Sequence, residues 1–154
     1  MDPVILQRET ETILDMMGIR VKSVDIIQDQ DLRITIISIR VPGDEQPLFT
    51  DHYNELSRDL GLMLRLIFEK KHRYFKDITV DVNGENLALI NHTKEKAALA
   101  VERVNFFEKP YEFGYLSSYE RMIIHSYLKQ VSDIVTESEG EGKERRLVVK
   151  KASS

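Results

Sequence analysis

The chain contains no cysteine. Disulfides, thiolate metal sites and cysteine nucleophiles are therefore excluded, and the absence is compatible with a reducing cytosol. The sequence also has no stretch that approaches the roughly twenty apolar residues needed to cross a bilayer. Residues 1–4 lack the basic region and the apolar run of a secretory signal. We therefore expect a soluble cytoplasmic protein without a membrane span.

Motifs of the common enzyme classes are missing as well. None of the four histidines stands at a helical or strand spacing from a second metal ligand; these are His52, His72, His92 and His125. Without cysteine or a His-Glu-x-x-His pattern, we expect no zinc or iron site. The sequence has neither the Gly-x-Ser-x-Gly elbow nor the Walker lysine loop. The interpretation is a non-catalytic protein that needs no metal and no cofactor.

The charge is distributed unevenly along a chain of globular composition. The 154 residues are 42% hydrophobic and 31% charged, enough for one ordinary domain or two small ones. With 22 Lys and Arg against 26 Asp and Glu, the net charge is −4. Residues 1–60 carry 6 Lys and Arg against 12 Asp and Glu, a net charge of −6. Residues 61–154 carry 16 Lys and Arg against 14 Asp and Glu, a net charge of +2. If the chain binds a polyanion, the second half is favoured as the binding part.

Periodicity in the first half predicts the order helix, strand, strand, helix, strand. The predicted elements are helices over residues 5–17 and 51–70 and strands over residues 21–27, 32–40 and 77–82. Residues 28–31 read as a hairpin turn, although they contain no glycine. The natural architecture is an open sheet with helices packed on one face, and the fold class is α+β.

The second half predicts two more helices and a closing hairpin. The elements are a helix over residues 86–104, a short strand before residue 114, a helix over residues 117–131, and strands over residues 134–136 and 146–150. Ser117 and Glu120 have the spacing of a capping box at the start of the last helix. We expect a first domain over residues 1–83 and a second over residues 84–154 with a loose tail.

The last predicted helix carries a row of hydrogen-bond donors. Arg121, His125 and Lys129 follow each other at i, i+4 and i+8, so they share one face, apart from the apolar one. Arginine can donate to two phosphate oxygens, lysine adds a point charge, and histidine can donate a hydrogen bond or stack on a base. A basic stripe on an amphipathic helix is more often a solvated face, so the stripe alone does not decide the function.

The predicted hairpin loop over residues 137–144 has mixed signals. Ser138, Gly140 and Gly142 allow a turn with accessible backbone N–H groups, which can bind an anion. The loop's glutamates repel phosphate, and Arg145 only partly compensates. By itself this loop is typical of an ordinary hairpin.

Helix and hairpin together resemble a known family. Residues 121–125, Arg-Met-Ile-Ile-His, fit the Arg-x-x-x-His signature of the R-three-H domain. Residues 136–149 are similar to that family's Thr-x-Ser-x-Gly segment, arginine and final strand, and the resemblance covers about residues 85–151. It implies binding of single-stranded nucleic acid, with Arg121 and His125 on an exposed surface.

The first half is similar to the KH-like domain that precedes the R-three-H domain in the bacterial Jag (SpoIIIJ-associated) family. Residues 48–56 take the place of that family's Leu-Ile-Gly-x-x-Gly-x-x-Leu segment, but Thr50 and Tyr53 replace both glycines. Glycine lets main-chain N–H groups approach phosphates, whereas bulky Tyr53 and anionic Asp51 should block and repel them. We expect a scaffold or a protein-interaction surface here instead of the usual RNA-binding loop.

Two further groups of residues have an ordinary structural interpretation. Most of the aromatic residues between 106 and 119 are expected to pack in the core; they are Phe106, Phe107, Tyr111, Phe113, Tyr115 and Tyr119. A basic corner that could contact phosphate is more typical of a solvated helix end; it comprises Lys70, Lys71, His72, Arg73 and Lys76.

The sequence therefore predicts a protein that binds single-stranded RNA or DNA, RNA more than DNA, through its second domain. The expected site consists of Arg121 and Lys129 on phosphate, His125 on phosphate or a base, Arg145 as a further charge, and Ser138 and Gly140 shaping the loop. Low sequence specificity is expected. The alternative is a protein–protein interaction adaptor whose acidic first half docks a protein partner.

Overall fold

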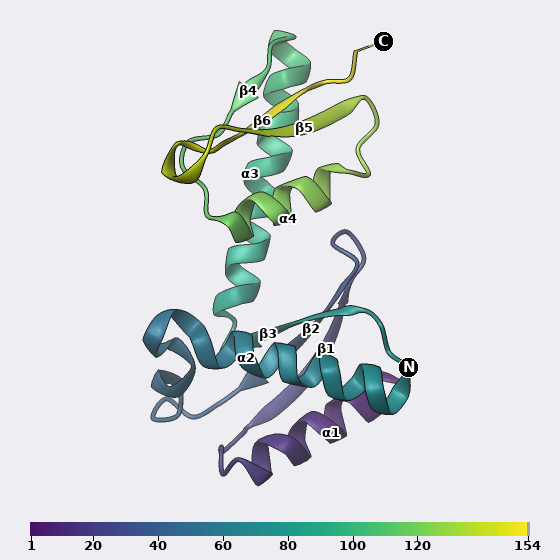
Figure 1. The fold of residues 1–154 in the computed structure, drawn as a ribbon, viewed down its shortest axis with the longest axis vertical. Helices are drawn as coiled ribbons and strands as arrows, with labels where there is room; N and C mark the ends of the chain where they lie inside the picture. Colours follow the sequence, from purple (N-terminus) through teal and green to yellow (C-terminus); the bar gives the residue numbers. More distant parts are fainter. Residues whose placement is uncertain (154) are drawn as a thin grey trace. The chain divides into compact units, whose positions relative to one another are not determined.

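The structure is a computed structural model that describes residues 1–51 and 55–153, and it is α+β, as predicted (Figure 1). Contacts divide the chain into an N-terminal unit, Met1–Leu87, and a C-terminal unit, Ala88–Ser154. Helix α3, Glu85–Phe107, begins in the first unit and continues in the second. Among the described residues, every helix is too short or too polar to cross a membrane.

The N-terminal unit has the predicted order of helix, strand, strand, helix and strand. Its elements are α1 (Pro3–Met16), β1 (Ser23–Asp29), β2 (Ile34–Arg40), α2 (Gln46–His72) and β3 (Asp77–Val82). The predicted start of the second helix at residue 51 is wrong, because α2 begins at Gln46. Pro47 does not prevent this start, since proline lacks only an N–H that the first turn leaves unpaired in any case.

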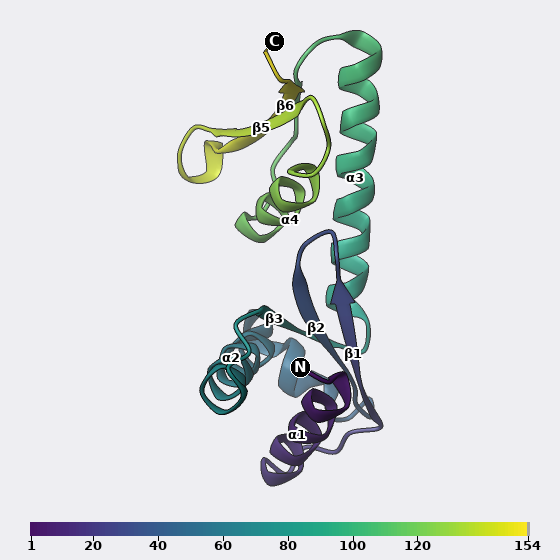
Figure 2. The same cartoon turned by 90° about the vertical axis from the view of Figure 1, so that its right-hand side faces the viewer.

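The sheet of the N-terminal unit has the strand order β1-β2-β3. Strand β2 lies in the middle, antiparallel to β1 and parallel to β3. Both α1 and α2 pack on one face of this sheet, as expected (Figure 2). The core between them consists mainly of Leu6, Leu14, Ile37, Ile39, Phe49, Leu60, Leu64, Phe68, Val80 and Val82.

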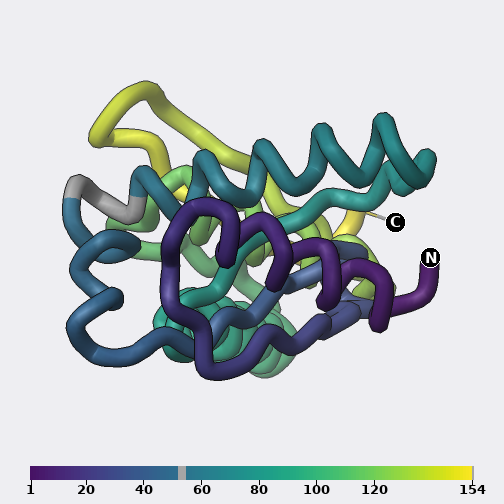
Figure 3. Tube along the Cα trace, turned by 90° about the horizontal axis from the view of Figure 1, so that it is seen from below, coloured from purple at the N-terminus to yellow at the C-terminus, as the bar shows by residue number. Residues whose placement is uncertain are grey.

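Helices α1 and α2 run side by side and are joined by an ionic contact (Figure 3). The Glu9 carboxylate accepts hydrogen bonds from Lys71 Nζ at 2.7 Å and from His72 Nε2 at 2.8 Å. Burial would raise the pKa of Glu9, but these two partners outweigh burial and lower it. Two members of the basic corner are therefore engaged in holding the helices together.

The C-terminal unit contains the remainder of α3 and a second small sheet. The further elements are β4 (Tyr111–Glu112), α4 (Ser118–Leu128), β5 (Ile134–Glu139), the 3-10 turn η1 (Gly142–Glu144) and β6 (Arg146–Lys151). All pairings are antiparallel, in the order β4-β6-β5. Both α3 and α4 supply the core against this sheet, which includes Ala97, Ala100, Val104, Phe113, Leu116, Ile124, Leu128, Ile134, Leu147 and Val149.

Two predictions for the C-terminal unit are corrected. Strand β5 extends to Glu139, so Ser138 pairs with Leu147 within the ladder and does not lie in the loop. The expectation that most of the aromatic residues are buried fails for Phe106, Phe107 and Tyr115, whose exposed fractions are 81%, 63% and 69%. Helical spacing does not reveal which side of α3 lacks a neighbour at Phe106 and Phe107, and Tyr115 lies in the segment between β4 and α4.

Candidate nucleic-acid interface

The capping box predicted for α4 is present and fixes where this helix begins. Ser117 Oγ accepts a hydrogen bond from the Glu120 N–H at 3.1 Å, and Glu120 Oε2 accepts one from the Ser117 N–H at 2.8 Å. Ile123 and Ile124 are completely buried. Because these residues set the inner face of α4, the row of donors is turned outward.

His125 connects α4 with the hairpin. Its Nδ1 lies 2.5 Å from Oγ1 of Thr136 in β5. A hydroxyl can donate or accept, so this contact suits either tautomer of the ring. With Nδ1 held, the ring is fixed in orientation, and Nε2 of this exposed side chain is available to a ligand. Thr136 stands in the recognised motif but was not predicted as a site residue, since its contact depends on packing between distant segments.

Arg121 is partly occupied by the segment that precedes α4. Its Nη1 donates to the Leu116 carbonyl at 2.8 Å, and its Nη2 donates to Ser118 Oγ at 3.0 Å. These bonds use two of the five guanidinium N–H groups. The side chain therefore holds the turn between β4 and α4 and still has donors for a phosphate group.

Strand β5 of the hairpin runs antiparallel to α4 (Figure 1), and the contact between Thr136 and His125 joins the two elements. Four helical residues rise about 6 Å and two strand residues about 6.6 Å. Since Thr136 lies against His125, we expect Ser138, two residues further along β5, to lie toward Arg121. Thr136 and Ser138 share the face of the sheet that meets the helices, because strand side chains alternate.

Alternation also places two glutamates away from the donors. Glu137 lies on the other face of β5, where its carboxylate accepts a hydrogen bond from Lys150 Nζ at 2.7 Å. Glu139 lies on that same face, opposite Arg146 in the register of β5 and β6. The repulsion expected from these residues is therefore directed away from the side on which Ser138 lies.

Of the remaining predicted residues, Lys129 lies on α4 and the other two flank the hairpin turn. Lys129 is the exposed C-cap of α4. Gly140 occupies the turn with φ of +85°, and Arg145 is exposed at the other side of that turn. Arg121, His125 and Lys129 thus follow one another along α4, and Thr136 links His125 to the hairpin that carries Ser138, Gly140 and Arg145.

Comparison with known families matches this part of the chain to one domain. Residues 92–151 match the R-three-H domain. This domain binds single-stranded nucleic acid, which supports a nucleic-acid-binding role for this part of the chain. The match includes α4 and the whole hairpin, and hence every predicted site residue. A search of curated proteins found no match.

The first turn of α4 in the R-three-H domain has an acid-sensitive cap. Burial would raise the pKa of Glu120, but its hydrogen bonds with Ser117 and the nearby Lys96 ammonium outweigh burial and hold the pKa below its ordinary value of 4.5. A carboxyl whose pKa is lower in the folded state stabilises the fold above the unfolded value. That contribution is lost as the pH falls through the folded-state value.

Glu120→Gln is therefore expected to lower the free energy of unfolding by about 0.5–1 kcal/mol near neutral pH, because the cap loses its charge. The difference in free energy of unfolding between the variant and the natural protein should disappear as the pH falls below the ordinary pKa range of carboxyl groups. Urea unfolding of both proteins at a series of pH values measures it. Glu112→Gln, at an exposed position of β4, is the control and should show no such convergence.

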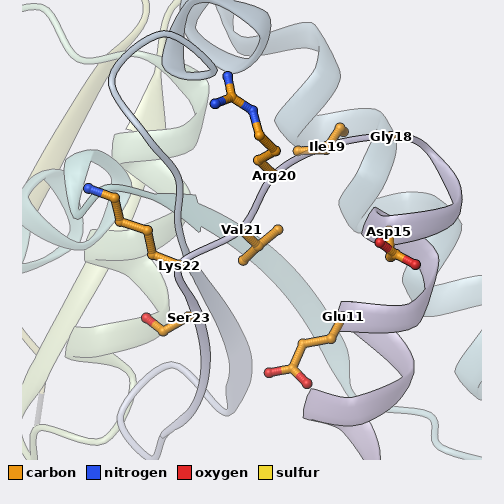
Figure 4. A pocket seen from close by; sticks show the side chains of 8 residues that line it. All are labelled: Glu11, Asp15, Gly18, Ile19, Arg20, Val21, Lys22 and Ser23. Carbon is orange, nitrogen blue, oxygen red and sulfur yellow. The ribbon is translucent and has the colours of Figure 1, made fainter.

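A cavity outside the R-three-H domain offers a weaker candidate. It measures about 500 Å³ and lies between α1 and the segment that follows it (Figure 4). Glu11 and Asp15 line one side, and Arg20 and Lys22 come from the other. Arg20 is held by Asp44 and by Glu45, the latter at 2.8 Å. Charges of both signs do not select an anion, and in the described part of the chain no cluster of His, Asp and Glu could hold a metal.

Proposed function

We propose that this protein is a non-catalytic, Jag-type binding protein for single-stranded nucleic acid, preferring RNA, and that its R-three-H domain makes the contact. The observation that carries the proposal is the row of donors on α4, locked to the hairpin by the bond between His125 and Thr136. A fixed imidazole beside a guanidinium suits a flexible phosphate backbone, because the donors are already in place when the strand arrives.

Each residue of the row has a separate role in this proposal. Arg121 and Lys129 bind phosphates at two points along the strand, and His125 contacts a phosphate or a base between them. Arg145 adds charge from the turn that Gly140 shapes, while Ser138 supports the loop. Recognition of this kind follows the backbone, so low sequence specificity is expected. The preference for RNA rests on the resemblance to the Jag family.

The N-terminal unit supports the R-three-H domain as a KH-like scaffold in this proposal. Its 11 Lys and Arg against 16 Asp and Glu give it a net charge of −5, which disfavours a second RNA site. Phe49, from the segment that replaces the glycine loop, is completely buried and belongs to the core. Tyr53, predicted to block phosphates, lies outside the described residues.

The test measures fluorescence anisotropy with short single-stranded RNA and DNA at several salt concentrations. Arg121→Ala and Lys129→Ala should each weaken binding to all sequences and reduce the salt slope by about one charge. Arg58→Ala is the matched control, because Arg58 is an exposed arginine of α2, 71% accessible. Circular dichroism verifies that each variant is folded.

Unchanged affinity and slope in both α4 variants would remove this row from the mechanism. Failure of the intact protein to bind at low salt, where attraction is least screened, would contradict nucleic-acid binding altogether. The adaptor interpretation would then be favoured, with recovery of one protein partner after nuclease treatment as its own test.

A further inference from the structure

A second cavity lies within the C-terminal unit, between α3 and the segment from β4 to α4. It measures about 340 Å³. Its lining residues are Lys96, Leu99, Ala100, Arg103, Tyr111, Phe113, Gly114, Tyr115 and Leu116. Ligand pockets in proteins begin at about this size. None of the residues predicted for the site belongs to it.

The cavity has an apolar floor and exposed hydrophobic side chains at its rim. Ala100, Phe113 and Leu116 are at most 5% exposed and form the floor. At the rim, Leu99 and Tyr115 are 58% and 69% exposed. Large apolar side chains left in water beside a concave surface are typical of a place where a flat hydrophobic group binds.

Both charged residues that line this cavity are cations. Arg103 lies over the ring of Tyr111, with its guanidinium carbon 5.3 Å from the ring centre. Lys96 is 3.5 Å from Glu120, so that acid offsets part of its charge. The combination of an exposed aromatic ring, an apolar floor and an arginine fits a group that has a flat aromatic part and an anionic part.

The cavity adjoins the first residue of the row of donors on α4. Leu116 contributes to the floor, and its carbonyl accepts the hydrogen bond from Arg121. Glu120, one residue before Arg121, contacts Lys96 at the cavity's edge. A strand whose phosphates follow the row toward the start of α4 therefore arrives at this opening.

We propose that this cavity binds one nucleotide, with the base against Tyr115 and the apolar floor and the phosphate on Arg103 and Lys96. The proposal rests on the proposed function in one respect, since the nucleotide is taken to belong to the strand bound along α4. A free mononucleotide has the same chemistry, and the experiment separates these two sources.

Gly114 offers a way to close the cavity without disturbing the fold. It lines the cavity, its backbone is outside the left-handed region, and an added Cβ would meet no atom within 4 Å. Gly114→Leu should therefore fold normally and fill the opening. Gly43→Leu is the matched control in the N-terminal unit, because Gly43 has the same open surroundings and an ordinary backbone.

The probes are a short adenylate oligomer, followed by anisotropy, and adenosine monophosphate, followed by nuclear magnetic resonance shifts. Gly114→Leu and Tyr115→Ala should each weaken oligomer binding about tenfold, the loss of one stacked base. Tyr115→Phe, which keeps the ring, and Gly43→Leu should bind like the natural protein. Arg103→Gln should reduce the salt slope by about one charge.

Mononucleotide shifts at the cavity that vanish in Gly114→Leu would support a free nucleotide as occupant, and an effect on oligomers alone would support the strand. Full oligomer affinity in Gly114→Leu and Tyr115→Ala, with binding still sensitive to Arg121→Ala, overturns the nucleotide pocket and leaves the proposed function standing. If the natural protein binds no oligomer, the proposed function fails, and the mononucleotide titration alone supports or overturns the pocket.

Discussion

Asp81→Ala is expected to lower the free energy of unfolding of the N-terminal unit by about 3 kcal/mol. The Asp81 carboxylate is completely buried and accepts hydrogen bonds from three donors. Oδ2 accepts hydrogen bonds from Ser38 Oγ at 2.8 Å and from the Gly84 N–H at 3.2 Å. Oδ1 accepts one from the Leu87 N–H at 2.9 Å.

The cost is large because these bonds cross between elements. Ser38 belongs to the neighbouring strand β2, and Leu87 lies in the first turn of α3. Removing the carboxylate leaves a buried hydroxyl and two partly buried backbone N–H groups without this acceptor, and each loss costs free energy. The negative carboxylate also lies at the N-terminus of α3, where the helix dipole is positive, and this attraction stabilises the fold.

Urea unfolding followed by circular dichroism measures the effect, with Asp77→Ala as the control. Asp77 lies on the same face of β3, but its side chain is 68% exposed and pairs with Arg65 at 3.0 Å, so its loss should cost less than about 1 kcal/mol. Asp81→Asn should fall between, since an amide keeps one acceptor but turns a donor toward another donor. Equal stability of the two alanine variants would contradict this role for Asp81.

The sequence predicted those features that depend on neighbouring residues. The element order of the N-terminal unit follows from periodicity, and the capping box of Ser117 and Glu120 follows from a spacing of three residues. The outward direction of His125 follows from the buried spacing of Ile124 and Leu128 on the same helix. Each of these is decided within a few turns of one helix or strand.

Features that depend on packing between segments were not predictable in this way. The contact of His125 with Thr136 joins residues 11 apart, and the bond from Arg121 to the Leu116 carbonyl depends on the path of a turn. Core packing was expected for most of the aromatic residues around Tyr115, because composition gives their number but not which of them lack a covering element. The proposed nucleotide cavity, which Tyr115 lines, could not be predicted either, because it also depends on which residues lack a covering element.

Gly140→Ala is expected to destabilise the C-terminal unit by about 3 kcal/mol, because the turn leaves no room for a side chain. Gly140 has φ of +85°, where an L-residue is strained by about 1–2 kcal/mol. An added Cβ would also lie 2.9 Å from the Glu144 carbonyl oxygen and 3.3 Å from its carbon. Both are backbone atoms, so the turn itself must move.

Gly142→Ala separates the steric part of this effect from the conformational part. Gly142 also has positive φ, +56°, but its added Cβ meets nothing within 4 Å, so a loss of only about 1 kcal/mol is expected. Thermal or urea unfolding of the two variants gives the difference directly. Gly140→Ala should also weaken binding of single-stranded RNA under conditions where it remains folded, because the displaced turn carries Arg145. Equal destabilisation by the two alanines would show that the close approach of residue 140 to Glu144 does not constrain the hairpin. Some other element would then have to hold Arg145 beside the bound nucleic acid.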